Sequence, residues 1–419
     1  MIQDLLIILP FILLLLSIAV LPITFSEFWE KKYPVISFGL AVIVIFYYLI
    51  FEGNAGKILH SLDEYISFIS LLFSLYIVSG GIFIKIRGKS TPLRNSILLF
   101  IGAIISNFFG TTGASMLLIR PYIETNKYRL KPYQIIFFIF IVSNIGGSLT
   151  PVGDPPLLLG YLKGIPFLWY FLNLFHIWAF AVIILLIIFY ITDKYFFDKV
   201  EPEIQEEVEQ EGERIRIEGK WNLVPLGIIV LSVLINEPKY LREIIMLLSA
   251  VLSYRLTSDK IHIKNHFTFA PIKEVAILFF GIFVTMIPAL TFVAENSVKF
   301  GLDKLRNVYW YSGILTSFLD NAPTFLNFLT GAMSSNKLSV NNPVMVLDFA
   351  VNNTEFLAAI SIASVFFGAM TYIGNAPNFM VKSISEHKGL KMPGFIEYMY
   401  KYSILVLLPL LIIIWFVFF

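Results

Sequence analysis

Long apolar runs, separated by short polar segments, form most of this sequence. Residues 5–23 and 402–419 are almost entirely apolar. As helices, such runs are long enough to cross the roughly 30 Å hydrocarbon layer of a membrane. The pattern predicts ten membrane spans, near residues 5–21, 34–51, 65–84, 133–162, 166–192, 221–236, 240–256, 272–296, 355–386 and 402–419.

Two further apolar segments, 93–120 and 306–330, carry a polar group at their centre. If each segment crossed the membrane once, the basic clusters on either side of it would lie on opposite faces. If each enters and returns as a re-entrant hairpin, 23 of the 31 Lys and Arg residues fall on one face. An excess of Lys and Arg marks the cytoplasmic face. We therefore predict two hairpins, with both chain termini outside.

The segment SNIGGSLTPVGDPPLLLG (143–160) interrupts an apolar run with glycines, prolines and an aspartate. Proline stops helix continuation and glycine permits the backbone angles of a break. Part of this segment, TPVGDPPLLL (150–159), aligns without gaps with TYIGNAPNFM (371–380), so Asp154 pairs with Asn375. We predict two broken helices, 133–162 and 355–386, that belong to a duplicated unit.

An acidic segment separates the two copies. Residues 193–220 contain ten acidic and five basic residues and no apolar run, which is typical of a solvated cytoplasmic linker. The predicted repeats are then 1–192 and 221–419. Each has five spans, an odd number, so their topologies are inverted. The prediction is an all-α polytopic protein of the cytoplasmic (inner) membrane, and inverted repeats with broken helices are typical of secondary transporters.

Composition supports a membrane protein and excludes several kinds of chemistry. The chain is 57% hydrophobic and only 14% charged, against about a quarter charged in soluble domains. It has no cysteine, and its five histidines form no H-E-x-x-H pattern. A G-D pair resembles that of intramembrane aspartyl proteases, but Pro151 stands where their GxGD segment has glycine. We expect no enzyme, no cofactor and no nucleic-acid partner.

The four polar interruptions are predicted to meet near the membrane centre as one binding site. Irregular backbone at that depth is tolerated only where protein or a water-filled cavity satisfies it. The candidate residues for ion or substrate binding are Asn107, Thr111, Thr112, Asn144, Thr150, Gly153, Asp154, Asp320, Asn321, Thr324, Thr371, Gly374, Asn375 and Asn378.

Asp154 and Asp320 favour a cation in this site. A carboxylate at the membrane centre costs roughly 2.5–3.5 kcal/mol on insertion scales, so we expect it to have a partner or a use. Two carboxylates repel an anion, and burial lets H⁺ compete with Na⁺ for them. The predicted Na⁺ ligands are Asp154, Asp320, Asn144 and Asn321. Na⁺/H⁺ antiport is the leading hypothesis, and a coupled carrier of carboxylates or other anions on the same scaffold is the alternative.

The segments SNIGGSLTPVGDPPLLLGYLKGIPF and SFLDNAPTFLNF resemble the signature segments of the NhaD-type sodium/proton antiporters. These belong to the ion transporter superfamily, which includes arsenite, citrate and divalent-anion carriers. The resemblance implies a scaffold and a moving transport domain, a homodimer, and Na⁺ and H⁺ as transported ions. It departs at the first polar tip, where NhaD-type proteins carry acidic residues and this chain has Phe108 and Phe109. The dicarboxylate branch has Ser-Asn-Thr at such tips, and Ser106-Asn107 is closer to that.

Overall fold

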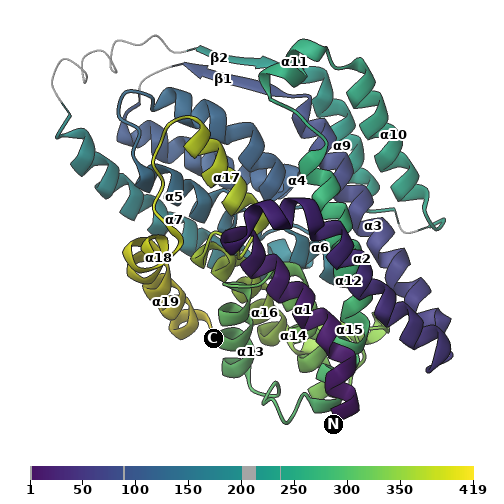
Figure 1. Cartoon of the computed structure of the whole chain (residues 1–419). Coiled ribbons are helices and arrows are strands. Elements are labelled where there is room, and N and C mark those ends of the chain that lie inside the picture. Colours follow the sequence, from purple (N-terminus) through teal and green to yellow (C-terminus); the bar gives the residue numbers. More distant parts are fainter. Residues whose placement is uncertain (1, 88–89, 201–213, 236) are drawn as a thin grey trace.

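A computed structural model of the chain describes residues 2–87, 90–200, 214–235 and 237–419. The described chain is helical almost throughout and contains a single two-stranded sheet (Figure 1). By length and composition, six of the described helices could cross a membrane, and a seventh span results if a pair of helices bent by 96° is counted as one. One of the six, residues 92–125, turns back on itself at Gly110. The protein is therefore an all-α polytopic membrane protein, as the sequence predicted.

The elements of the first part of the chain are α1 (Ile2–Thr24), α2 (Ser26–Ile50), α3 (Ala55–Gly80), β1 (Phe83–Arg87), α4 (Pro92–Thr125), α5 (Pro132–Ile141), the short 3-10 helix η1 (Ile145–Gly147), α6 (Pro155–Lys163) and α7 (Trp169–Phe197).

The later elements are β2 (Arg214–Glu218), η2 (Lys220–Asn222), α9 (Leu223–Ser232), α10 (Leu241–Leu256), α11 (Asp259–Lys264), α12 (Ala270–Asn296), α13 (Leu305–Thr316), α14 (Asn321–Ser335), α15 (Pro343–Asn352), α16 (Thr354–Phe366), η3 (Phe367–Met370), α17 (Ala376–His387), α18 (Phe395–Tyr398), the π-helix η4 (Met399–Leu407) and α19 (Leu408–Phe418).

The segment predicted as a linker over 193–220 begins later than its charge suggested. Its first five residues are the last turns of α7, where Asp193 is completely buried rather than solvated. Its last part forms β2, which pairs antiparallel with β1 in a register that places Phe83 opposite Glu218. Residues 201–213 of the predicted linker lie outside the described residues. The strand pair, α11 and α15 were not predicted from the sequence.

Helix α4 is a hairpin that turns back at Gly110. This glycine has φ 73° and ψ 156°, a backbone conformation that residues with a side chain rarely adopt. Near the two ends of α4, the Asn95 Nδ2 group donates a hydrogen bond of 2.7 Å to Asn126 Oδ1. A straight helix would separate these residues by roughly 46 Å, at 1.5 Å per residue. The two arms therefore run side by side, with the polar tip at their turn.

Helices α13 and α14 form the corresponding pair in the second half of the chain, with residues 317–320 between them. The two helices pack against each other. A β-carbon built on Gly331, in α14, would lie 2.3 Å from Leu302 Cδ1, just before α13. The chain therefore returns close to the point where it entered, as in the first hairpin.

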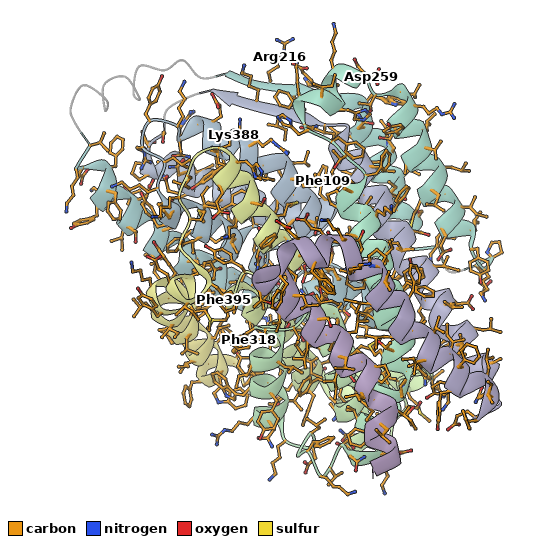
Figure 2. The ribbon with its side chains drawn as sticks, viewed as in Figure 1. Phe109, Arg216, Asp259, Phe318, Lys388 and Phe395 are labelled. Atoms are coloured by element: carbon orange, nitrogen blue, oxygen red, sulfur yellow. The ribbon has the colours of Figure 1, made fainter. Side chains whose placement is uncertain are left out.

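The helices pack in two groups. Helices α1, α2, α3, α9, α10 and α12 contact one another, whereas the two hairpins and the two broken helices gather with α7 and α19. The groups meet where α3 packs on α4 and α12 packs on α14 (Figure 1). The strand pair and α11 cap one end of the molecule. Figure 2 shows Arg216, Asp259 and Lys388 toward this end, away from Phe318 in the second hairpin.

Candidate functional site

The two broken helices have the same backbone geometry where they restart. Asp154 has φ −147° and ψ 145° and precedes α6, and Asn375 has φ −150° and ψ 139° and precedes α17. Both new helices carry proline in their first two positions, where the missing N–H has no intrahelical partner to lose. Neither cap residue uses its side chain to cap its own helix. Both side chains are therefore available for contacts across the site.

A threonine fastens each break to the neighbouring hairpin. The Thr150 hydroxyl donates 2.6 Å to the carbonyl oxygen of Asn107, and the Thr371 hydroxyl donates 2.5 Å to that of Ser317. Each threonine oxygen also accepts, at 3.1 Å, the N–H of the glycine three residues later. The alignment of 150–159 with 371–380 therefore corresponds to matching hydrogen bonds.

Both of these glycines lie where the chain crosses itself. A β-carbon on Gly153 would stand 2.0 Å from the carbonyl oxygen of Gly147, and one on Gly374 would stand 2.6 Å from that of Gly368. Real β-carbons do not approach an oxygen so closely. Gly153 and Gly374 therefore serve the backbone of the breaks, and no ligand is needed to explain them.

Asp154 lies where all four interruptions meet. Its side chain is 1% exposed, and its Oδ1 accepts hydrogen bonds from Thr111 Oγ1 at 2.6 Å and from Asn375 Nδ2 at 3.2 Å. Its Oδ2 accepts from Asn321 Nδ2 at 2.5 Å. Thr111 begins the return arm of the first hairpin, Asn321 begins α14, and Asn375 precedes α17. Each of the other three interruptions thus supplies one neutral donor to this carboxylate.

The immediate surroundings of Asp154 contain no positive side chain within ion-pair distance among the described residues. Its charge is held by neutral hydrogen bonds alone. The other amide atom of Asn321, Oδ1, is buried and has no hydrogen-bond partner in the described chain. A buried acceptor of this kind is costly unless something donates to it or binds it. Asp154 and Asn321 together therefore offer carboxylate and amide oxygens at one point.

Asn144 and Asn378 link the two broken helices behind Asp154. Asn144 Nδ2 donates 2.7 Å to Asn378 Oδ1, while Asn144 Oδ1 lies 3.2 Å from Asn375 Nδ2. Asn378 Nδ2 donates to the carbonyl oxygens of Gly368 and Thr371, at 2.8 and 2.9 Å. Both asparagine side chains are fully buried. Their hydrogen bonds hold the two breaks in a fixed position relative to each other.

Asp320, the second carboxylate predicted as a Na⁺ ligand, directly precedes Asn321 at the start of α14. Its side chain caps α14, where it accepts the N–H of Ala322 at 3.0 Å. It forms no hydrogen bond with Asp154. Thr324, one turn into the same helix, donates to the carbonyl oxygen of Asp320 at 3.0 Å. Of the four predicted Na⁺ ligands, the structure brings Asp154 and Asn321 into contact, connects Asn144 through Asn375, and places Asp320 at a helix cap.

A comparison with protein families shows to which family the chain belongs. A family model described as "Putative citrate transport" matches residues 2–419, almost the whole chain. The chain belongs to this citrate-transport family. No curated protein matches the chain. The family agrees with the prediction of a secondary transporter of the ion transporter superfamily, but the NhaD-type sodium/proton specificity that the signature segments suggested receives no support from the match.

A cavity of about 70 Å³ reaches the site of this citrate-transport family member from one side. Thr111, Thr112 and Gly153 line its inner part, and Tyr76 of α3 and Ile272 of α12 line it from the other group of helices. A second, apolar groove of about 450 Å³ lies between α4 and α7 and reaches Asn107 and Thr150. The predicted site residue Thr112 therefore lines this cavity and is not among the donors to Asp154.

Two contributions to the site were not predicted from the sequence. Trp178 donates its indole N–H to the carbonyl oxygen of Gly146 in the first break, at 3.1 Å. Asn107 also donates to this oxygen, at 2.7 Å, and accepts the N–H of Leu149 at 2.9 Å. Both side chains satisfy the backbone of the break. Trp178 could not be singled out because its sequence context is that of an ordinary apolar helix.

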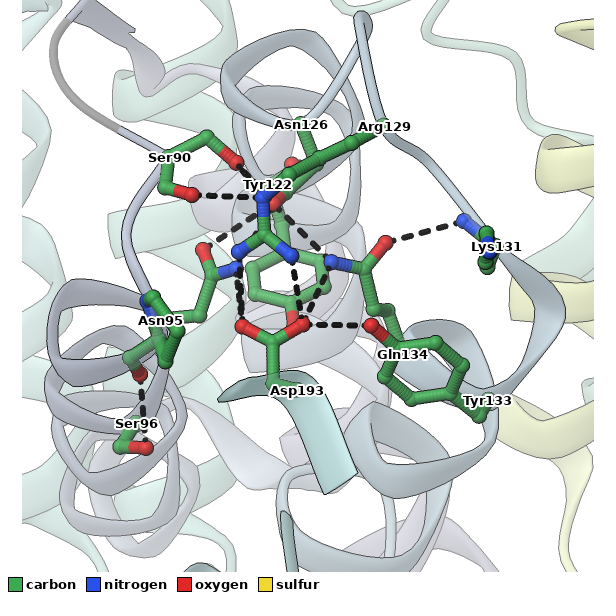
Figure 3. A network of polar contacts seen from close by, with 11 residues as sticks. Ser90, Asn95, Ser96, Tyr122, Asn126, Arg129, Lys131, Tyr133, Gln134 and Asp193 are labelled. Atoms are coloured by element: carbon green, nitrogen blue, oxygen red, sulfur yellow. Dashed lines mark hydrogen bonds and ion pairs between the residues drawn. The ribbon is translucent and has the colours of Figure 1, made fainter. Parts of the chain in front are cut away.

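The second missed feature is a buried ion pair at the base of the first hairpin. Arg129 contacts Asp193 through two parallel hydrogen bonds of 2.7 Å, and both side chains are almost fully buried (Figure 3). Tyr133, Gln134 and Asn95 also donate to the Asp193 carboxylate, at 2.6, 3.1 and 3.1 Å. These bonds join both ends of the hairpin to α7. The first hairpin is thus held to α7 at its base as well as to the breaks at its tip.

Proposed function

We propose that this protein is a cation-coupled carrier of citrate or a related polycarboxylate. The observation that carries the proposal is the meeting of four helix N-termini around Asp154. The return arm of the first hairpin, α6, α14 and α17 all begin there, and each contributes one polar residue at or beside its first position: Thr111, Asp154, Asn321 and Asn375.

Helix N-termini suit an anion because their first N–H groups lack intrahelical partners and their dipoles carry partial positive charge. Broken helices whose N-termini point at an anionic substrate group recur in secondary transporters. The cation hypothesis depended on two carboxylates in the site, and only Asp154 is at its centre while Asp320 caps a helix. One buried carboxylate among four N-termini supports an anion carrier better than a site for cations alone.

Asp154 then supplies the coupling. In this structure its carboxylate accepts the same donors that a substrate carboxylate would need, from Thr111, Asn321 and Asn375. A proton or Na⁺ bound to Asp154 removes its charge and releases these donors to the substrate. Cation and anion therefore favour each other's binding, and this coupling is reciprocal by thermodynamic necessity. If the site changes sides of the membrane only when cation and anion are both bound, or when both are absent, the cation gradient drives accumulation of the anion.

The test is uptake of radiolabelled citrate by proteoliposomes that contain the purified protein. Three arms impose an inward Na⁺ gradient, an inward H⁺ gradient or no gradient, and unlabelled citrate, a dicarboxylate and a monocarboxylate are offered as competitors. We expect uptake above the no-gradient level in one of the two gradient arms, and competition by polycarboxylates. A pH-sensitive dye inside the vesicles reports antiport in parallel. If Na⁺ moves protons while no carboxylate enters or competes, the protein is a sodium/proton antiporter and the proposal is wrong.

A further inference from the structure

Arg120 stands out because it is an arginine in a hairpin arm with no counter-charge. It lies on the return arm of α4, nine residues after Thr111 and thus roughly 13 Å further along the helix. Its side chain is partly buried. In the described chain the buried Arg129 and the partly buried Arg242 each pair with a carboxylate, whereas Arg120 forms no ion pair or hydrogen bond there. An unpaired positive charge at this depth calls for an anionic partner.

Arg120 lies on the same face of the return arm as Thr112, which lines the small cavity at the site. Thr112, Met116 and Arg120 are spaced four residues apart and therefore share one face of the arm. Thr112 lines the cavity, and so does Tyr76 of α3, which lies near the Arg120 guanidinium. The Tyr76 hydroxyl donates 2.7 Å to the carbonyl oxygen of Thr268, so Tyr76 reaches toward the segment that precedes α12. The same face of the arm thus runs from the donors around Asp154 to Arg120.

The arm ends at the face of the molecule that carries the strand pair. Glu124 and Lys127, just beyond Arg120, are exposed. This face also holds the described basic residues of 85–87, 90–94 and 120–131, and the sequence predicts it to be cytoplasmic. An anion that approaches the site from this face along the return arm passes Glu124 and then Arg120, the positive side chain nearest to Thr112 on that face of the arm. A positive charge beside a binding site raises the local concentration of anions.

We propose that Arg120 is the anion-recruiting residue of this passage. A polycarboxylate pairs first with its guanidinium, beside Tyr76, and is then handed to the neutral donors at Thr111. Only the identity of the anion rests on the proposed function. Arginine suits the first step because its planar group pairs with a carboxylate through two hydrogen bonds. The second step needs donors without a fixed charge, because an ion pair in the centre would hold the anion too tightly to release it.

The absence of cysteine from this chain makes a direct test possible. Thr112→Cys places one thiol in the cavity, two helical turns below Arg120. Vesicles of each orientation are treated with an anionic or a cationic membrane-impermeant thiosulfonate, and the ratio of the two labelling rates is measured. From the strand-pair face, we expect Arg120→Gln to lower the anionic-to-cationic ratio roughly threefold to tenfold, the effect of one charge at about 10 Å in a partly wet site. Arg120→Lys, which keeps the charge, retains most of the ratio.

Lys127→Gln is the matched control, because it removes a positive charge from an exposed position on the same segment. If it lowers the ratio as much as Arg120→Gln, or if Arg120→Gln leaves the ratio unchanged, Arg120 is an ordinary interfacial charge and the inference is wrong. In the transport assay, Arg120→Gln should raise the KM for citrate about tenfold when substrate is loaded from this face and leave the KM from the opposite face unchanged. If the wild-type protein carries no polycarboxylate but Arg120→Gln still lowers the labelling ratio, the proposed function is wrong and the anion-recruiting role of Arg120 is supported.

Discussion

Replacing Asp154 by asparagine separates its charge from its structural role. The three neighbours of this carboxylate all donate to it. An asparagine keeps one acceptor oxygen but turns the other into an N–H₂ group, which cannot accept from Asn321. Asn321 has an unpartnered Oδ1, so rotation of its amide by half a turn converts it into the acceptor that the new N–H₂ group needs. This rotation leaves only the Nδ2 group of Asn321 without an acceptor, so we expect Asp154→Asn to cost about 1–3 kcal/mol of folding stability.

Asp154→Ala is the contrasting variant. It leaves the donors of Thr111 and Asn321 buried without an acceptor, whereas Asn375 Nδ2 keeps Ser143 O and Asn144 Oδ1 as acceptors, both at 3.2 Å. Each unsatisfied group costs about 1–3 kcal/mol, so the two lost acceptors should cost about 2–6 kcal/mol of folding stability. Removing a buried charge offsets part of this loss. Denaturant titration of the detergent-solubilised protein, followed by tryptophan fluorescence, measures both variants. If Asp154→Asn is as unstable as Asp154→Ala, the arrangement of donors described here is wrong.

The transport of Asp154→Asn tests the coupling. The variant resembles the cation-bound state, so citrate should still bind and exchange across the membrane without Na⁺ or H⁺. For each coupled cation, a tenfold gradient stores about 1.4 kcal/mol and accumulates substrate about tenfold. In the wild type we expect such accumulation, and in Asp154→Asn an internal-to-external ratio near one with exchange retained. Gradient-driven accumulation by this variant would show that another group couples the cation.

Three further predictions concern the structure around this site. Asp193→Asn leaves the Arg129 guanidinium buried without its counter-charge and should destabilise the protein by about 3–5 kcal/mol, whereas replacing both residues by apolar ones of similar size should restore most of the loss in the same denaturant titration. Gly153→Ala should abolish citrate uptake or prevent folding, because its β-carbon would lie 2.0 Å from the carbonyl oxygen of Gly147; normal uptake would contradict the crossing of the chain at this break. Asn375→Asp places a second carboxylate within 3.2 Å of the first, so citrate uptake should depend on a higher power of the cation concentration than in the wild type.

The sequence determined the features that depend on local composition. Runs of apolar residues established a helical membrane protein, because a lipid environment admits few other structures. Proline and glycine in 143–160 and 371–380 located both breaks, since these residues act on the backbone wherever they stand. The pairing of Asp154 with Asn375 could also be predicted, because the two segments align without gaps. That alignment corresponds to nearly equal backbone angles at the two positions.

Only the tertiary structure decided which polar groups meet. Asp154 and Asp320 looked equivalent in sequence, yet Asp154 is held by three neutral donors while Asp320 caps α14. Asp193 was counted with a solvated linker because acidic residues follow it, and its partner Arg129 is 64 positions earlier in the chain. Hydrogen bonds across such separations depend on how helices pack, which no local pattern records. For the same reason the charge of Asp154 suggested a cation site, and the four helix N-termini around it became visible only in the folded protein.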